Sequence, residues 1–296
     1  MPRLEYLHLV DQTIFEQPLS LNNPSVEELP SVPLPHLVTL QLFGTTYDCT
    51  TLLSHISLSS SVDLEIHCIG VETIPEIQAL MDFVKNNFAR SSAIDNTSLG
   101  VRLDASASEL SLNVDIISDM EPKRLLSLGM YPRVAEFFEG HVSTVCPIIF
   151  DSIPAAATKR LDMRSKFSIS PDAWTYVLHR MTEVRVLDVS FAGAVNLSHV
   201  LGSYTANTSS FVAKQLRSLT FSGVSFTCKT SQQFQFHEAL LECLQRRSNG
   251  DQRVKNLNFH SCSDVGATVP PHFRKVAYKV QWDQEPEEDT MMLSDY

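Results

Sequence analysis

The chain contains two close groupings of histidine and cysteine, residue types that bind zinc. They are His67-Cys68 and His260-Ser261-Cys262. A structural zinc site needs four ligands, arranged as two pairs at short spacing. No second pair accompanies either group, and each group directly follows an apolar segment that is expected to be a strand. We therefore expect both cysteines to pack as small hydrophobic side chains in a core, and we predict no metal site and no cofactor.

The sequence patterns for nucleotide binding and for a serine nucleophile are incomplete. The chain has neither Gly-x-x-x-x-Gly-Lys-Ser/Thr nor Gly-x-Gly-x-x-Gly, the loops that hold phosphate groups. Gly223-Val224-Ser225 begins like the elbow of a serine hydrolase, but Thr227 stands where that pattern needs its second glycine. We therefore predict that the protein is not an enzyme. A hydrolase with a non-local active site is an alternative, since a catalytic triad is defined by geometry.

The composition indicates an acidic, globular chain. Of its 296 residues, 34 are Asp or Glu and 23 are Lys or Arg, which gives a net charge of −11. Such a chain repels a phosphate backbone, so we predict no nucleic-acid partner. There is no run of about 18 apolar residues, so we predict no membrane span. The six cysteines form no Cys-x-x-Cys pair and no secretory signal is visible, which indicates a cytoplasmic or nuclear location.

One apolar spacing recurs along the chain and predicts a series of strands. It places three apolar residues at relative positions 1, 4 and 6, as in Leu37, Leu40 and Leu42. The last two are two residues apart, so they share one face of a strand. Such triplets, or looser variants of them, begin at residues 4, 37, 61, 99, 158, 184, 216 and 254.

Amphipathic helical patterns precede most of these strands. In 74–90 the apolar residues follow one helical face, and Thr73 with Glu76 has the spacing of a capping box. Ser170 and Pro171 are typical of an N-cap followed by a first helical turn. We expect helices over 49–57, 74–90, 142–153, 170–181 and 233–247.

The order of these elements predicts the fold class. Strand starts lie 24 to 59 residues apart, which matches strand-plus-helix units of irregular length. We predict an α/β fold, namely a leucine-rich-repeat-like solenoid of irregular strand–helix units with a stacked, largely parallel sheet. An ordinary α/β domain with coincidental leucine spacing is the alternative.

The same reading predicts the domain limits. Residues 1–282 are expected to form a single leucine-rich-repeat-like domain with an irregular insertion at about 104–141, and 283–296 an acidic disordered tail. Near the insertion, 108–117 alternates as a strand and is expected to form a hairpin with 99–103. The alternating segment 276–282 is expected to cap the last open edge.

The C-terminal third combines three features in a recognisable order. A helical segment from Phe236 to Arg247 is followed by Val254-Lys255-Asn256-Leu257-Asn258-Phe259 and then by Val280-Gln281-Trp282-Asp283. This order resembles the closing segment of the basidiomycete-type fungal F-box/leucine-rich-repeat proteins. Leu34 to Leu42, taken with 52–56, is similar to the recurrent strand–helix unit of that family.

The resemblance implies a role in substrate recognition. In this family the repeats recruit substrates to a ubiquitin ligase, and an F-box segment docks on the Skp1 adaptor. The sequence looks like the repeat portion only, because no F-box segment is present. We therefore expect no binding to Skp1.

The residues between the apolar positions of each strand face the other way. Across a stack of strands they are expected to line a concave surface. That surface is polar, mixed in sign and poor in aromatic side chains, which suits recognition of a protein better than an apolar ligand pocket. Its candidate residues are Tyr6, His8, Thr39, Gln41, Asp63, Glu65, Arg160, Asp162, Asp188, Ser218, Thr220, Asn256 and Asn258.

Together these observations predict a non-enzymatic protein-interaction module whose protein partner is not identified by the sequence. One alternative is a truncated gene product without independent function. In that case the first strand should present an exposed apolar edge, because terminal repeats need caps. The hydrolase with a non-local active site is the other alternative.

Overall fold

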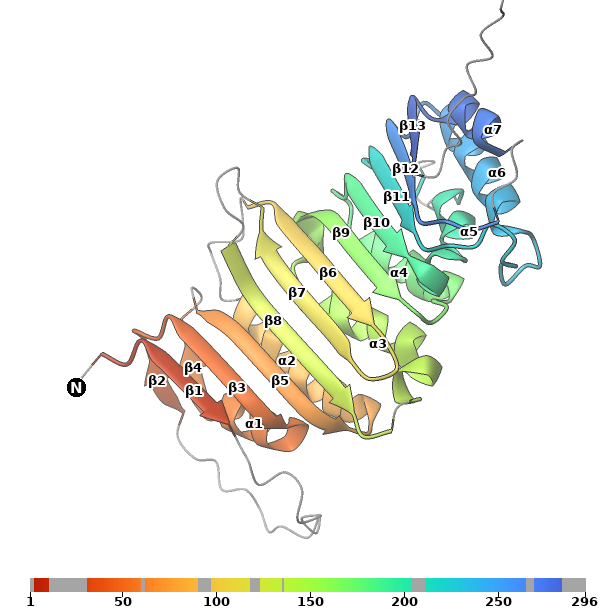
Figure 1. Cartoon of the computed structure of the whole chain (residues 1–296). Coiled ribbons are helices and arrows are strands. Elements are labelled where there is room, and N and C mark those ends of the chain that lie inside the picture. Colours follow the sequence, from red (N-terminus) through yellow and green to blue (C-terminus); the bar gives the residue numbers. More distant parts are fainter. Residues whose placement is uncertain are drawn as a thin grey trace, which may run out of the picture.

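A computed structural model of the chain describes residues 3–10, 31–59, 62–89, 97–117, 123–134, 136–203, 211–264 and 269–283. These residues form a mixed α/β fold around one large, mostly parallel sheet (Figure 1). The helices lie against one face of this sheet, behind the strands over the middle of the sheet as drawn and to the right of them at its C-terminal end. None of the described helices is long and apolar enough to cross a membrane.

The described part of the chain contains thirteen strands, eleven of them in the large sheet. They are β1 (Tyr6–Val10), β2 (Val32–Leu34), β3 (Thr39–Thr45), β4 (Ile56–Leu58), β5 (Asp63–Val71), β6 (Leu99–Ala105), β7 (Leu110–Ile116), β8 (Lys123–Pro132), β9 (Thr158–Ser165), β10 (Val186–Ser190), β11 (Ser218–Ser222), β12 (Asn256–His260) and β13 (Lys279–Trp282). The order across the large sheet is β1-β3-β5-β8-β7-β6-β9-β10-β11-β12-β13. Neighbouring strands are parallel except that β7 is antiparallel to both β6 and β8. β2 and β4 form a separate parallel pair.

The helices form a layer that follows the strands across the sheet. They are α1 (Thr46–Ser54), α2 (Ile74–Ala89), α3 (Phe137–Ser152), α4 (Pro171–Arg180), α5 (Leu197–Leu201), α6 (Phe236–Asn249) and α7 (Val269–Val276), with short 3-10 turns η2 (Ala155–Ala157) and η3 (Phe191–Ala194). Each α-helix packs on the next in chain order, from α1 on α2 to α6 on α7. The apolar side chains between helices and strands make one continuous core.

The apolar triplets of the sequence form ladders inside this core. Leu161 of β9 lies beside Leu187 of β10, and the ladder continues through Leu219 and Leu257 on the next two strands. All four side chains are buried. Because side chains alternate between the two faces of a strand, the residues in between are left on the face away from the helices.

Two helix starts form the caps that the sequence predicts. The Glu76 carboxylate accepts hydrogen bonds from the backbone amides of Glu72 and Thr73, at 2.9 and 3.0 Å. Ser170 Oγ accepts one from the amide of Ala173 at 3.2 Å. These side chains satisfy amides that the first turn of a helix leaves without partners.

Residues 104–141 are more regular than the sequence suggested. The predicted hairpin is confirmed, since β6 and β7 pair in antiparallel register. The chain then continues into β8, which lies between β7 and β5. The region predicted as an irregular insertion thus adds two strands to the sheet, because each has an alternating apolar side to bury. α3 begins at Phe137, before the predicted start at 142, and α7 was not predicted.

The two edges of the large sheet differ in how their apolar side chains are covered. At β13, the Trp282 ring lies 4.4 Å from the Phe259 ring, so the predicted C-terminal edge strand packs on the core. At the opposite edge, Leu4 and Leu9 are 44% and 40% exposed. Of the predicted acidic tail, only Asp283 lies within the described residues.

Candidate functional site

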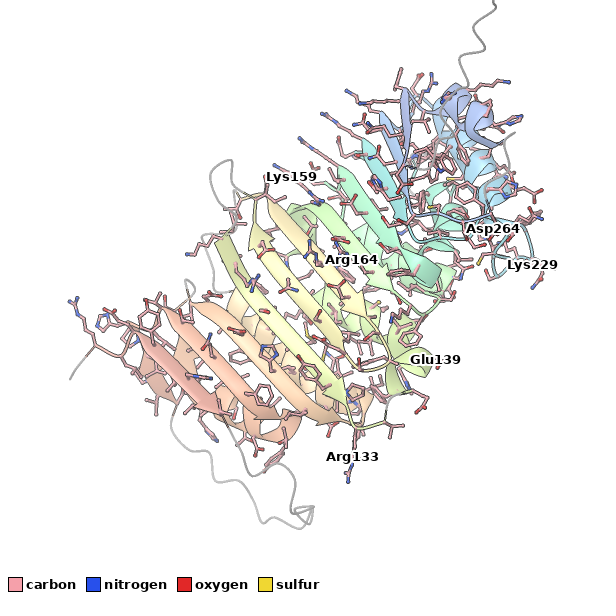
Figure 2. All side chains as sticks on the ribbon, viewed as in Figure 1. Arg133, Glu139, Lys159, Arg164, Lys229 and Asp264 are labelled. Atoms are coloured by element: carbon pink, nitrogen blue, oxygen red, sulfur yellow. The ribbon has the colours of Figure 1, made fainter. Side chains whose placement is uncertain are left out.

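The face of the large sheet opposite the helices is the candidate site, and we call it the open face. Figure 2 shows its side chains along the whole length of the sheet. Every strand of the large sheet contributes alternate residues to it, and on the inner strands from β3 to β12 the residues in between belong to the buried ladders. The thirteen predicted residues all lie on strands of the large sheet, and the strand registers sort them into two rows.

The first row takes one residue from each of the eleven strands, side by side. We call it the central row. Seven of its members were predicted, and they come from β1, β3, β5, β9, β10, β11 and β12. The row reads His8, Gln41, Glu65, Ser127, Asn113, Arg102, Asp162, Asp188, Thr220, Asn258 and Gln281.

The six other predicted residues lie two positions earlier on their strands. They form two separate groups, which are Tyr6, Thr39 and Asp63 on β1, β3 and β5, and Arg160, Ser218 and Asn256 on β9, β11 and β12. Strands β8, β7 and β6 separate these groups. The thirteen predicted residues therefore do not form one contiguous patch, whereas the complete central row does.

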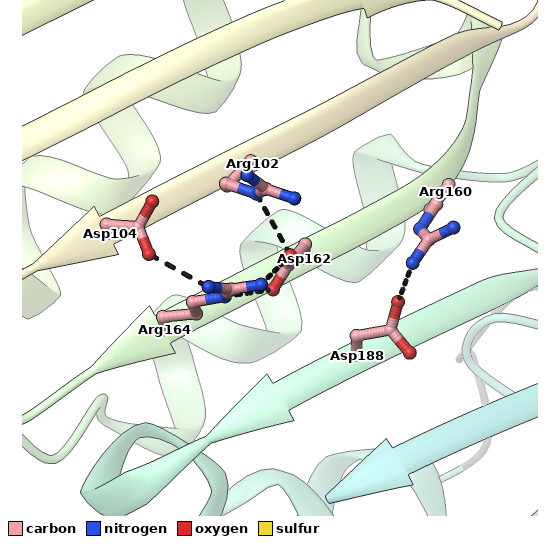
Figure 3. Close-up of polar contacts among 6 residues, drawn as sticks. All are labelled: Arg102, Asp104, Arg160, Asp162, Arg164 and Asp188. Atoms are coloured by element: carbon pink, nitrogen blue, oxygen red, sulfur yellow. Dashed lines mark hydrogen bonds and ion pairs between the residues drawn. The ribbon is translucent and has the colours of Figure 1, made fainter. Parts of the chain in front are cut away.

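Paired charges occupy the middle of the open face (Figure 3). The Asp162 side chain is only 7% exposed and accepts hydrogen bonds from Arg102 Nε at 3.0 Å and Arg164 Nη2 at 2.9 Å. Arg160 Nη2 donates to Asp188 at 2.8 Å. The three arginines and three aspartates of Figure 3 neutralise one another, so this region is strongly polar without carrying a net charge.

Near the N-terminal edge, the open face has a hollow of about 390 Å³ lined by rings, which we call the ring hollow. The rings of Phe43, His67 and Tyr131 follow one another across β3, β5 and β8, with centroids 5.9 and 6.2 Å apart. The Glu65 carboxylate stands beside them. It accepts a hydrogen bond from Gln41 Nε2 at 2.7 Å and lies 3.2 Å from His67 Nε2. The contact with His67 is the main cause that lowers the pKa of Glu65 below its usual value.

Sequence reasoning missed the ring hollow and four members of the central row. Ser127 was missed because β8 was not predicted, although Leu126 and Leu128 alternate around it. Phe43 and His67 each lie two residues beyond a predicted face residue. Extending the period of two by one step along β3 and β5 was the available signal.

The residues that the sequence singled out for metal or nucleophile chemistry include Cys68, Cys262 and Ser225, all of which the structure describes. No group of three or more His, Cys, Asp or Glu side chains that could hold a metal ion occurs among the described residues. Cys68 and Cys262 are fully buried, as their apolar context predicts. The Ser225 hydroxyl donates to the Asp264 carboxylate and contacts Thr227 Oγ1, so its neighbours are oxygens rather than a histidine base.

No protein-family model matches the chain, and no curated protein matches it. The candidate site therefore depends on the geometry of the open face alone.

Proposed function

We propose that the fold is a leucine-rich-repeat-like solenoid of irregular strand–helix units. Triplets from successive strands lie in register, and each α-helix packs on the next in chain order, which supports the proposal. A single strand–helix unit cannot bury its apolar side, but stacked units cover one another. Strands β6, β7 and β8 depart from the pattern because they follow one another without intervening helices.

We further propose that the chain is a non-enzymatic protein-interaction module, and that its open face recruits a protein partner. The observation that carries this proposal is the central row. Eleven strands spaced about 4.8 Å apart make the row about 50 Å long, which suits a protein surface and is too long for a small molecule. The role resembles that of the substrate-recruiting repeat region of fungal F-box proteins in a ubiquitin ligase.

The proposed location is the cytoplasm or the nucleus. All six cysteines are free thiols, and five of them are buried. Free thiols are typical of proteins in reducing compartments. The net charge of −11 supports a protein partner rather than a nucleic acid.

Affinity capture from the source organism, with matched variants, tests the proposal. Asn113→Arg and Thr220→Arg each place a bulky cation in the central row, on β7 and β11. Gln245→Arg is the control, because this exposed residue lies on α6, in the helix layer. A partner that is captured by the wild type and the control but lost with both central-row variants supports the proposal. Equal capture by all four proteins contradicts it.

A truncated product without independent function is the second candidate. The exposure of Leu4 and Leu9 at the β1 edge is the observation that favours it, since apolar residues of a terminal repeat need a cover. This candidate predicts no partner whose capture responds to the central-row variants. The same experiment therefore separates the two candidates.

A further inference from the structure

We propose that the ring hollow binds an arginine side chain of the partner protein. The inference rests on the proposed function, because it names the chemistry of the partner that the open face recruits. It makes the N-terminal part of the open face a specific docking site rather than a generally polar surface.

The walls of the ring hollow fit a flat cation. The Phe43 side chain is 39% exposed on a sheet face where most positions are polar. The His67 and Tyr131 rings are nearly parallel, with 23° between their planes. A guanidinium group is planar and stacks on such ring faces, whereas the compact ammonium of lysine has no flat face to match them.

The ring hollow contains one carboxylate, Glu65, that no described lysine or arginine neutralises. Among the described residues, its partners are His67 and Gln41. In the middle of the sheet, by contrast, Asp162 and Asp188 are each paired with an arginine. The ring hollow is therefore where the open face would attract a cation from outside.

The position of the Glu65 carboxylate suits a guanidinium. Gln41 contacts one carboxylate oxygen and His67 the other, so both oxygens are held in place. The side chain is still 37% exposed, which leaves lone pairs free on the solvent side. A fixed carboxylate can accept two parallel hydrogen bonds from arginine. Arg124, whose charge also acts on Glu65, is itself paired with Asp115 at 3.7 Å.

A nuclear magnetic resonance titration tests the proposal. The probes are three synthetic peptides, Gly-Ser-X-Ser-Gly with blocked ends, in which X is arginine, lysine or the neutral isostere citrulline. We expect the arginine peptide to shift the signals of Phe43, His67 and Tyr131. Glu65→Gln should weaken this binding about fivefold, as expected for removal of one partly exposed charged contact. Glu139→Gln makes the same chemical change on α3, away from the open face, and should leave the affinity unchanged.

Each contrary result has a definite meaning. Equal binding of the arginine and citrulline peptides would overturn the role of charge, and equal binding of the lysine peptide would overturn the role of the flat cation. An absence of shifts at the three rings would overturn the site itself. If capture of the partner needs Thr220 and Asn113 but not Glu65, the proposed function stands and the arginine site fails. If the arginine peptide binds the ring hollow but the central-row variants do not change capture of the partner, the arginine site stands and the proposed function fails.

Discussion

Replacement of Arg247 by methionine tests how a buried cation stabilises the C-terminal part of the fold. Arg247 lies in α6 and has no exposed surface. Its Nη1 donates to the carbonyl oxygens of Leu201 and Val212, at 3.1 and 2.8 Å, and its Nη2 donates to that of Ala213 at 3.0 Å. These carbonyls belong to the end of α5 and to the segment before β11. One side chain thus ties α6 to two other parts of the chain.

The expected loss follows from the three carbonyl groups. Methionine keeps an apolar stem but has no donor, so the variant loses all three hydrogen bonds. The carbonyls of Leu201 and Val212 are then left without a partner, whereas that of Ala213 still accepts the amide of Leu216 at 3.0 Å. Two unsatisfied buried groups at about 1–3 kcal/mol each, with one further lost hydrogen bond to a charged donor at about 1.5–3 kcal/mol, cost about 3–9 kcal/mol together. Burial disfavours the charged guanidinium and lowers the pKa of Arg247, so the variant regains several kcal/mol of desolvation energy. The net prediction is a loss of about 3 kcal/mol in the free energy of unfolding.

Urea unfolding followed by circular dichroism measures this loss. Arg246→Met is the matched control, because the neighbouring side chain is 58% exposed and pairs with Glu242, one turn earlier on α6. A surface pair of this kind contributes about 0.5 kcal/mol. An Arg247→Met protein that unfolds at the same urea concentration as Arg246→Met would refute the reasoning, since the three carbonyls would then not need the guanidinium.

Three other changes have expected outcomes. Asn196→Ala should lower the free energy of unfolding by about 2–3 kcal/mol in urea, because the buried amide makes three hydrogen bonds; a loss below about 0.5 kcal/mol would contradict this. Gly223→Ala should lower the free energy of unfolding by about 1–2 kcal/mol and with it the melting temperature, because φ is +63° and the new Cβ would lie 2.8 Å from the Phe191 ring. An unchanged melting temperature would show that the loop relaxes freely. The contact with His67 lowers the pKa of Glu65 in the folded protein. The ionised Glu65 carboxylate therefore stabilises the fold above its unfolded-state pKa of about 4.3, and this stabilisation is lost as pH falls through the folded-state pKa. Glu65→Gln should therefore be less stable than the wild type near neutral pH and equal to it in acid, and a difference that does not change with pH would contradict the assignment.

The open face was largely predictable because one strand period fixes both sides of the sheet. Leu40 and Leu42 are buried, so Gln41 between them must face away from the helices. The same reasoning placed the predicted residues on β5, β9, β10, β11 and β12. The order of strands was not predictable in this way, because local spacing identifies a strand but not its neighbour. The position of β8 beside β5 depends on contacts between residues far apart in the sequence.

The role of Arg247 shows a different limit of sequence reasoning. Arg246 and Arg247 together are typical of a helix C-terminus, where cations interact with the last carbonyl groups. Helical periodicity, however, places Arg247 on the same side of α6 as Leu240 and Leu244, and that side is buried. Charge and periodicity make opposite predictions here, and periodicity is correct, because the guanidinium meets carbonyl groups of segments packed against the helix.

The antiparallel strand β7 does not interrupt the central row, and strand register explains why. Residues directly opposite one another in a pair of strands point to the same face. Asn113 lies opposite both Ser127 and Arg102, and its Oδ1 accepts a hydrogen bond from Ser127 Oγ at 3.1 Å. A slip of one residue would bring Leu112 and Val114 to the open face and bury Asn113. Burial of these two apolar side chains therefore selects the register that continues the polar row, so the force that stabilises the sheet also positions the residues of the candidate binding surface.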